Sequence, residues 1–179
     1  MLEGFRFKVG LSYSRLHFRK NHDRIMSFTD ALTRSHRALV ILPDPSLDSE
    51  STSALFRFLL RKFSSEEMMV LLRDDQLRAM STTPALKTLV YSSEDINSWY
   101  IPRQELLKKM ETHSFDVALD LNYNLSLPSA FLCKASNAPL RVSFVKQNGD
   151  QFYNFQVRTK GTTVNSSSYR SLLKCIDMF

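Results

Sequence analysis

The chain has 179 residues, of which 43% are hydrophobic and 23% are charged. This length fits one domain with a hydrophobic core of its own, and the composition excludes an intrinsically disordered chain. No apolar run approaches the roughly 20 residues of a membrane-spanning helix, and charges interrupt the N-terminal apolar residues, which argues against a signal peptide. A cytoplasmic location is therefore the default expectation.

Cysteine and histidine usage gives no sign of a metal centre. Cys133 and Cys175 lie far apart in apolar, helix-like stretches, without the spacing of a metal site or the density of a disulfide scaffold. We interpret both as small buried hydrophobes, the usual role of a free cysteine. The histidines are scattered, and none has a ligand partner at helical spacing. We expect no metal site.

The net charge of +6 is concentrated at the N-terminus, where residues 1–24 hold six basic residues against two acidic ones. A nucleic-acid-binding domain usually carries its basic residues as a patch on the folded domain. Here the charge belongs to an arm over residues 1–26, so we expect no nucleic-acid partner.

The apolar residues of the arm fit two periods. Alternate positions from Phe5 to Tyr13 are apolar, as in a strand. Apolar residues also form one stripe at helical spacing, made of Leu2, Phe5, Val9, Tyr13 and Leu16. We favour a basic amphipathic helix over residues 2–20. Such a helix can dock on another protein, lie on an anionic membrane through residues 1–24, or pack on its own domain.

Short apolar runs bounded by turn residues predict a series of buried strands. In chain order they cover residues 38–42, 68–72, 86–91, 115–121 and 140–144. Helix signals lie between them: a cap at Ser51 or Thr52, a short stretch over 75–80, and prolines that open helices at Pro102 and Pro128.

The last part of the chain carries different signals. Asn148-Gly149 is typical of a hairpin turn and predicts an antiparallel edge strand over residues 152–157. Ser168 is expected to cap a final helix.

Strand and helix signals alternate through residues 37–144, which is typical of a parallel sheet with helices on both faces. The sequence therefore predicts a single Rossmann-like three-layer α/β domain over residues 27–179. Its sheet is expected to be mostly parallel with an antiparallel edge strand, and the basic helical arm over 1–26 precedes it.

Ligands of such sheets bind beyond the carboxyl ends of the strands, where the strand order reverses. The loops that would line this crevice cover residues 43–50, 92–101 and 121–128. The first loop should carry glycines if backbone amides are to approach nucleotide phosphates, but it holds prolines and carboxylates instead. We expect no bound dinucleotide, FAD or ATP in the usual mode, and no other cofactor.

The acidic residues of the crevice are the weak candidates for catalysis. Asp44 or Asp48 could act as a general base, with Asp120 across the crevice as its orienter. The alternative is structural: Asp48 or Ser49 begins the next helix, and Asp44 and Asp120 serve turns or caps. We favour the structural alternative, so the chain is expected to be a binding part more than an enzyme.

Aromatic and basic side chains are the candidates for partner binding. Trp99 and Tyr100 could stack a sugar or base, form an interface hot spot, or cover the helix at Pro102. Together with the arm they define a candidate partner surface made of Phe5, Phe7, Arg15, Phe18, Arg19, Lys20, Trp99 and Tyr100.

Several stretches resemble the N-terminal half of heptosyltransferase-type glycosyltransferases. They are Arg37–Pro43, Ala54–Phe63, Leu71–Arg73, Phe115–Leu121, Phe131–Ser136 and Pro139–Val142. The resemblance implies the acceptor-side domain of a two-domain enzyme, and the chain ends before a donor-binding second domain. The family's first loop has a Gly-Asp pair with a catalytic Asp; Asp48 lies near that place, without the glycine and in a differently spaced loop.

Nearly the whole chain also resembles a family of short, uncharacterised bacterial proteins related to these transferases. The similar features are the basic N-terminal segment, the Asn97-Ser-Trp-Tyr100 region before a helix, and a Phe-Asp-x-x-x-Asp-Leu strand. This resemblance implies no activity.

These observations favour a non-catalytic accessory or scaffold subunit, built on a degenerate glycosyltransferase-like domain. It would bind a protein partner or larger complex, in the cytoplasm or at the cytoplasmic face of a membrane. The alternative is a sugar-binding or glycosyltransferase-related domain that needs a separate donor-binding domain.

Overall fold

The strands form where the sequence runs through short apolar segments, because a buried parallel sheet satisfies the backbone while helices cover both faces. The computed structural model describes residues 2–21, 23, 27–43, 49–80, 86–159 and 166–177. Its strands are β1 (Ala38–Ile41), β2 (Met68–Arg73), β3 (Lys87–Tyr91), β4 (Val117–Asp120), β5 (Leu140–Phe144) and β6 (Phe155–Val157).

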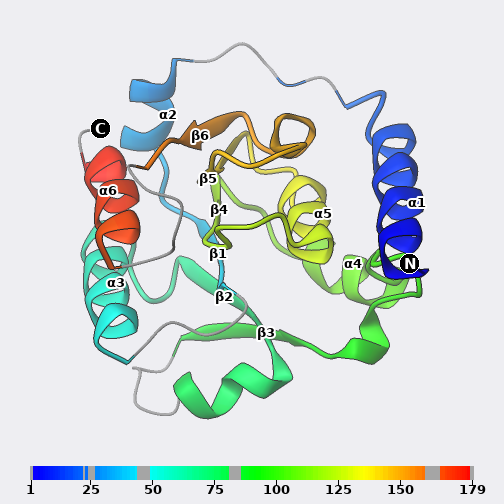
Figure 1. Cartoon of the computed structure of the whole chain (residues 1–179). Helices are drawn as coiled ribbons and strands as arrows, with labels where there is room; N and C mark the ends of the chain where they lie inside the picture. Colours follow the sequence, from blue (N-terminus) through cyan, green and yellow to red (C-terminus); the bar gives the residue numbers. More distant parts are fainter. Residues whose placement is uncertain are drawn as a thin grey trace.

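The strands lie in one parallel sheet, in the order β3-β2-β1-β4-β5-β6 (Figure 1). The chain starts in the middle with β1, moves outward to β3, and returns to place β4 on the other side of β1. The strand order therefore reverses between β1 and β4. This doubly wound order is that of a Rossmann-like domain, so the predicted fold class is confirmed.

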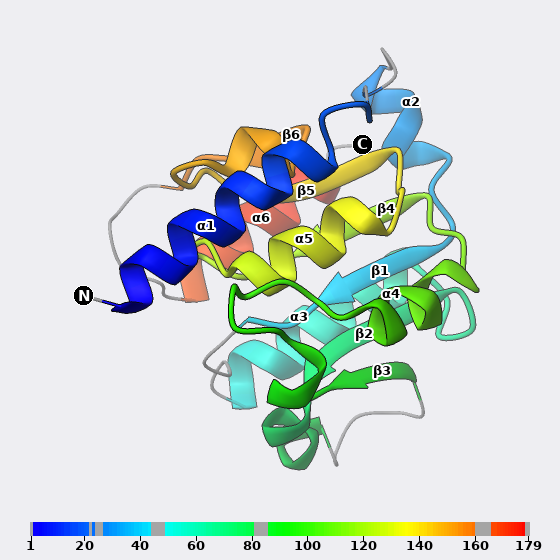
Figure 2. The same cartoon turned by 90° about the vertical axis from the view of Figure 1, so that its right-hand side faces the viewer.

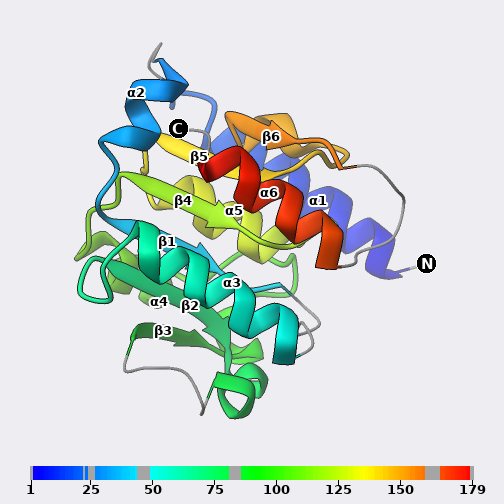
Figure 3. The same ribbon diagram turned by 90° about the vertical axis from the view of Figure 1, so that its left-hand side faces the viewer.

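Helices cover both faces of the sheet. On one face lie α3 (Ser49–Lys62) and α6 (Ser166–Asp177), and on the other lie α4 (Gln104–Glu111) and α5 (Leu127–Ala135) (Figures 1 and 3). A short helix that the sequence did not predict, α2 (Phe28–Thr33), packs near β5. Short 3₁₀ helices are η1 (Asp74–Met80), η2 (Ser93–Asp95) and η3 (Gly149–Gln151).

The predicted serine and threonine caps are wrong, because the predicted positions lie inside the helices. The helix α3 begins at Ser49, before both Ser51 and Thr52, and Ser168 lies inside α6. Both helices begin in runs of serine and threonine, where several neighbouring residues could serve as the cap, so the sequence does not distinguish them.

The predicted helix start at Pro102 is also displaced. Pro102 is paired with Ile96 in an isolated antiparallel bridge, and Arg103 is the N-cap of α4. The proline belongs to the loop because its fixed backbone angle suits an extended segment as well as a first helical turn.

The antiparallel edge strand predicted from Asn148-Gly149 is wrong. Asn148 has the left-handed conformation of a turn, with φ of 61°, but the chain continues into η3 instead of reversing. Phe152 and Tyr153 then bury their rings, and β6 enters the sheet parallel to β5. Burial of these two aromatic side chains lengthens the connection beyond a hairpin, and the strand direction follows from that longer path.

The N-terminal segment forms α1 (Leu2–His17), so the helical interpretation of the arm is confirmed and the strand alternative is wrong. This helix runs along the outer side of α5, on the face of the sheet opposite α3 and α6 (Figures 1 and 2).

Two apolar clusters fill the spaces on the two faces of the sheet. One lies under α3 and α6 and includes Leu59 and Phe144. The other lies under α4 and α5, includes Phe131, and takes in Leu11 and Phe18 of the N-terminal segment. The inner face of α1 is therefore part of the same core as α5.

The two cysteines differ in burial. Cys133 of α5 is fully buried, as predicted, whereas Cys175 of α6 is only partly buried, so the prediction of burial is wrong for the second. Burial, and then the negative charge of Asp120, raise the pKa of the Cys133 thiol well above its ordinary value.

Candidate functional site

Gly10 lets α1 lie directly against the loop that follows β3. A Cβ atom at position 10 would stand 2.0 Å from the main-chain oxygen of Trp99 and 2.8 Å from Cδ2 of Leu127. The loop is braced at this point, since Oδ1 of Asn97 accepts hydrogen bonds from the main-chain N–H groups of Trp99 and Ile101. Only glycine fits here without displacing the helix.

Phe18 closes the other end of this contact. Its ring is buried, with centroids 4.7 Å from that of Phe131 and 6.5 Å from that of Phe152. Phe7 of α1 is partly buried and packs against the same cluster. These rings hold the helix to the domain, and Phe18 presents no surface to a partner.

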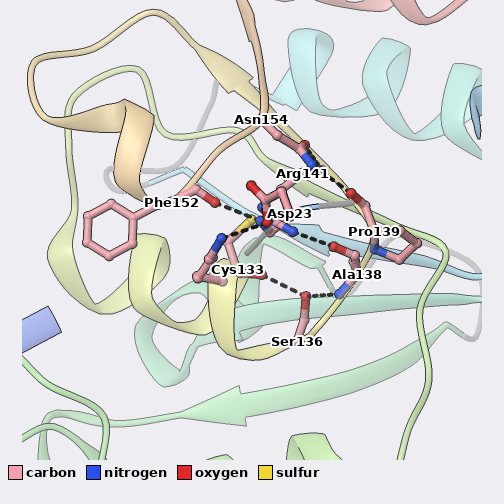
Figure 4. A network of polar contacts seen from close by, with 9 residues as sticks. Asp23, Cys133, Ser136, Ala138, Pro139, Arg141, Phe152 and Asn154 are labelled. Atoms are coloured by element: carbon pink, nitrogen blue, oxygen red, sulfur yellow. Dashed lines mark hydrogen bonds and ion pairs between the residues drawn. The ribbon is translucent and has the colours of Figure 1, made fainter. Parts of the chain in front are cut away.

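A polar network attaches the chain just beyond α1. Oδ1 of Asp23 accepts hydrogen bonds from Nζ of Lys134 at 2.8 Å and from Nη2 of Arg141 at 2.5 Å (Figure 4). The buried guanidinium of Arg141 also donates to the main-chain oxygens of Ala138 and Phe152. One carboxylate thus neutralises two cations that α5 and β5 would otherwise leave buried and unpaired.

The charge of Asp23 is maintained by these partners. Partial burial by itself would raise the pKa of the carboxyl, but the hydrogen bonds and positive charges of Lys134 and Arg141 outweigh it, and the pKa is lowered. The network therefore stabilises the ionised Asp23 carboxylate, and with it the attachment of the segment after α1 to α5 and β5.

With its inner face fixed, α1 turns an apolar face to the solvent. The stripe that the sequence shows at helical spacing is this outward face. Its exposed side chains, together with a neighbouring tryptophan, are Leu2 (70% exposed), Phe5 (60%), Tyr13 (49%), Leu16 (69%) and Trp99 (41%). We call these five residues the α1 face. Phe5 and Trp99 meet edge to face, with ring centroids 6.4 Å apart, so the loop extends the helix surface.

Basic side chains border the α1 face. Lys8 and Arg15 are exposed along the helix, and Arg19 and Lys20 are exposed in the turn that follows it. Arg15 is oriented by hydrogen bonds from its guanidinium to the side chains of Asn148 and Gln151. The surface combines exposed apolar groups with positive charge.

The carboxyl end of β4, where ligands of such sheets bind, holds a closed polar cluster instead. Asp120 is fully buried, and its Oδ1 accepts hydrogen bonds from the main-chain and side-chain nitrogens of Asn122 at 3.0 and 2.7 Å. Its Oδ2 accepts a hydrogen bond from the hydroxyl of Tyr153 and lies 3.5 Å from Nζ of Lys146. Both oxygens are engaged by the protein itself.

Lys146 and Tyr153 complete this cluster. Nζ of Lys146 donates to the main-chain oxygen of Asn122 at 2.6 Å and lies 4.8 Å from the ring centroid of Tyr153. Burial of Tyr153, followed by the charge of Asp120, raises the pKa of its hydroxyl. The cluster joins β4 to the segment before β6, and its contacts hold these two parts of the chain together.

The structure brings only part of the predicted surface together. Phe5 and Trp99 lie in the α1 face, Arg15, Arg19 and Lys20 border it, and Tyr100 lies half-buried beside it with φ of 61°. Asp44 and Asp48, the predicted candidates in the first loop, lie outside the described residues.

Other site residues were missed at the sequence level. Leu16 and Leu2 were visible in the helical stripe but were not assigned a role, because the stripe alone does not tell which side of a helix faces the domain. Gly10 carried a usable signal, since glycine inside a helix often marks a close approach of backbones. Asp23 carried none, because its partners are more than 100 residues away in sequence.

Among the described residues, no group of three or more His, Cys, Asp or Glu side chains is placed to hold a metal ion. The described helices also include none that is long and apolar enough to cross a membrane.

No family model, curated protein or solved structure matches the chain.

Proposed function

We propose that this protein is an accessory subunit that docks on a protein partner through the α1 face. The observation that carries the proposal is the pairing of a fixed inner face with an apolar outer one: Gly10 and Phe18 hold the helix to the domain while Phe5 and Leu16 stay exposed. Contiguous exposed apolar side chains on a folded domain typically mark an interaction surface.

The dimensions of the face suit a helix or a groove on a partner. Leu2 to Leu16 span 14 helical steps, which is about 21 Å at 1.5 Å per residue. The exposed anchors at positions 2, 5, 13 and 16 lie on one stripe of the helix, the arrangement by which an amphipathic helix enters an apolar groove. Trp99 and Tyr13 add the large, rigid aromatic groups that supply most of the binding energy at protein interfaces.

Charge complementarity indicates an acidic partner. Lys8, Arg15, Arg19 and Lys20 border the face, so a second copy of the chain would bring like charges together. Carboxylates around an apolar groove would instead meet these cations at the rim of the interface, where they speed association and fix its register.

A second candidate occupant is an anionic membrane surface. Its support is the composition of α1 and its surroundings, where Phe, Leu and Trp side chains lie between lysines and arginines, as in helices that rest in the headgroup region. The protein partner is preferred because α1 is already rigidly attached, which suits a shaped groove.

The buried state of Asp120 supports a non-catalytic role for this end of the sheet. A general base must reach a substrate proton, and both oxygens of this carboxylate are already bound by Asn122, Tyr153 and Lys146. Descent from a glycosyltransferase acceptor domain is part of the proposal; its support is the sequence resemblance and a doubly wound sheet that many unrelated proteins share.

Affinity purification of the tagged full chain from its own cells tests the proposal. The double variant Phe5→Ser/Leu16→Ser removes two anchors of the α1 face, and the matched control Leu77→Ser/Val145→Ser removes two exposed apolar side chains elsewhere. We expect an acidic protein to copurify stoichiometrically with the wild type and the control, to be released by salt, and to be lost from the α1 variant.

Two results would contradict this account. Equal recovery of the partner with both variants would place the interface elsewhere. Binding of the wild type to vesicles containing phosphatidylserine, lost in the α1 variant and without a protein partner, would assign the face to a membrane.

A further inference from the structure

A cleft of about 400 Å³ opens beside α1 at the carboxyl ends of β2 and β3. Its walls come from parts of the chain that are distant in sequence: α1, the ends of the two strands, the loop over 92–101 and the start of α5. The lining residues used below are Arg6, Arg73, Asp74, Ser93, Ser98 and Tyr100.

The cleft lies at the same edge of the sheet as the carboxyl ends of the strands, beside β2 and β3, and Asp120 is not among its lining residues. Its volume is within the range of about 300–1,000 Å³ of small-molecule sites. Its floor is preformed, because Ser92 and Asp95 form a reciprocal capping box at η2 and Asn97 braces the next turn. A ligand would therefore enter without ordering this loop.

Several hydrogen-bond donors that line the cleft are not paired with any described residue. Within the described part of the chain, the side chains of Arg6, Ser93, Ser98 and Tyr100 have no hydrogen-bond or ion-pair partner. Arg73 differs, because its guanidinium is paired with Asp75. Arg6 thus supplies the uncommitted positive charge, and the three hydroxyl groups supply neutral donors and acceptors.

We propose that this cleft binds a small organic anion, with one phosphate or carboxylate group paired to Arg6 and a hydroxylated body of a few carbons against Ser93, Ser98 and Tyr100. The planar guanidinium can donate two parallel hydrogen bonds to such a group. Asp74 on the lining, and Asp75 paired with Arg73, limit the favourable charge, which selects against polyphosphates.

The position of Arg6 links this site to α1. Every other lining residue named here comes from the sheet edge or its loops, so a ligand held by Arg6 would join the helix to the sheet. Ligand binding would then slow the detachment of α1. This inference does not depend on what binds the opposite, outward face of the helix.

Titration with glycerol 3-phosphate tests the proposal, with binding measured by calorimetry and by amide NMR shifts. Glycerol serves as the uncharged control ligand. Arg6→Gln removes the cation, and Lys8→Gln removes a charge from the same helix outside the cleft. No described residue forms a hydrogen bond or ion pair with the Arg6 side chain, so Arg6→Gln should fold normally, which thermal unfolding checks.

We expect saturable binding of glycerol 3-phosphate, with amide NMR shifts at Ser93, Ser98 and Tyr100. Glycerol should cause no such shifts. Arg6→Gln should weaken binding about tenfold or more, the effect of one charge-assisted contact, while Lys8→Gln should leave it unchanged. The proposal would be overturned if neither glycerol 3-phosphate nor its carboxylate counterpart glycerate bound saturably at millimolar concentration, or if Arg6→Gln bound as well as the wild type.

Discussion

The main-chain oxygen of Trp99 occupies the space that a side chain on Gly10 would need, at 2.0 Å from the position of its Cβ atom. This contact lets α1 approach the loop after β3 closely enough for Phe5 to meet the Trp99 ring. The attachment of the helix and the composition of its exposed face therefore depend on the same residue pair.

Substitution of this glycine should loosen α1. Gly10→Ala places a methyl group against backbone that Asn97 braces, and overpacking of this kind costs about 1–3 kcal/mol of unfolding free energy. Urea unfolding measures the loss, and hydrogen exchange should show faster exchange in α1 than in β1.

Gly4 is the matched control for that substitution. No atom lies within 4 Å of a Cβ built there, so Gly4→Ala should stabilise the helix by about 0.5–1 kcal/mol through its better helix propensity. Equal effects of the two substitutions would contradict the close contact at Gly10.

The Asp23 network predicts a pH dependence of stability. The pKa of Asp23 is lowered in the folded protein, so its contribution is present above the unfolded-state pKa of about 3.9 and is lost as the pH falls through the folded value. Asp23→Asn removes it. Unfolding free energies should differ most between wild type and variant near neutral pH and converge below about pH 4. A difference in unfolding free energy between wild type and variant that stayed constant with pH would argue against a stabilising role of the ionised Asp23 carboxylate.

The Asp120 cluster predicts strong coupling between two buried charges. Lys146→Met leaves the Asp120 carboxylate without its cation and should cost about 3–5 kcal/mol, measured by urea unfolding. Asp120→Asn in the same chain should recover much of that loss, because the unpaired charge is then gone. Additive effects of the two substitutions would show that the pair is not coupled.

The cysteines should react very differently with a thiol reagent. Burial and the nearby Asp120 raise the pKa of Cys133, so the reactive thiolate is scarce as well as inaccessible. Cys175 is partly exposed and should be modified first in the folded protein. Peptide mass spectrometry after brief labelling would detect this order, and early labelling of Cys133 would contradict the packing of α5.

The architecture was predictable because its signals are local. Apolar runs such as Ala38–Ile41, separated by helix signals, determine a parallel sheet once right-handed connections are assumed. The direction of β6 was not predictable in this way. It depends on Phe152 and Tyr153 filling space under the sheet, which the Asn148-Gly149 turn signal does not contain.

The candidate site was predictable only in part, for a similar reason. The helical stripe of α1 was evident, but α1 has apolar residues on both sides, such as Leu11 inward and Leu16 outward. Periodicity alone does not decide which side packs on the domain. The small buried residues Gly10 and Ser14 mark the inner side, and this becomes clear only from the contact of Trp99 with Gly10.

Site-directed photo-crosslinking in the native cells tests the proposed docking most directly. A photo-reactive amino acid is placed at position 16, in the α1 face, or at position 77, an exposed apolar position on η1. We expect one discrete adduct with an acidic protein from position 16, lost when Phe5→Ser is added, and none from position 77. No adduct at position 16, or the same adduct from both positions, would contradict the proposed docking.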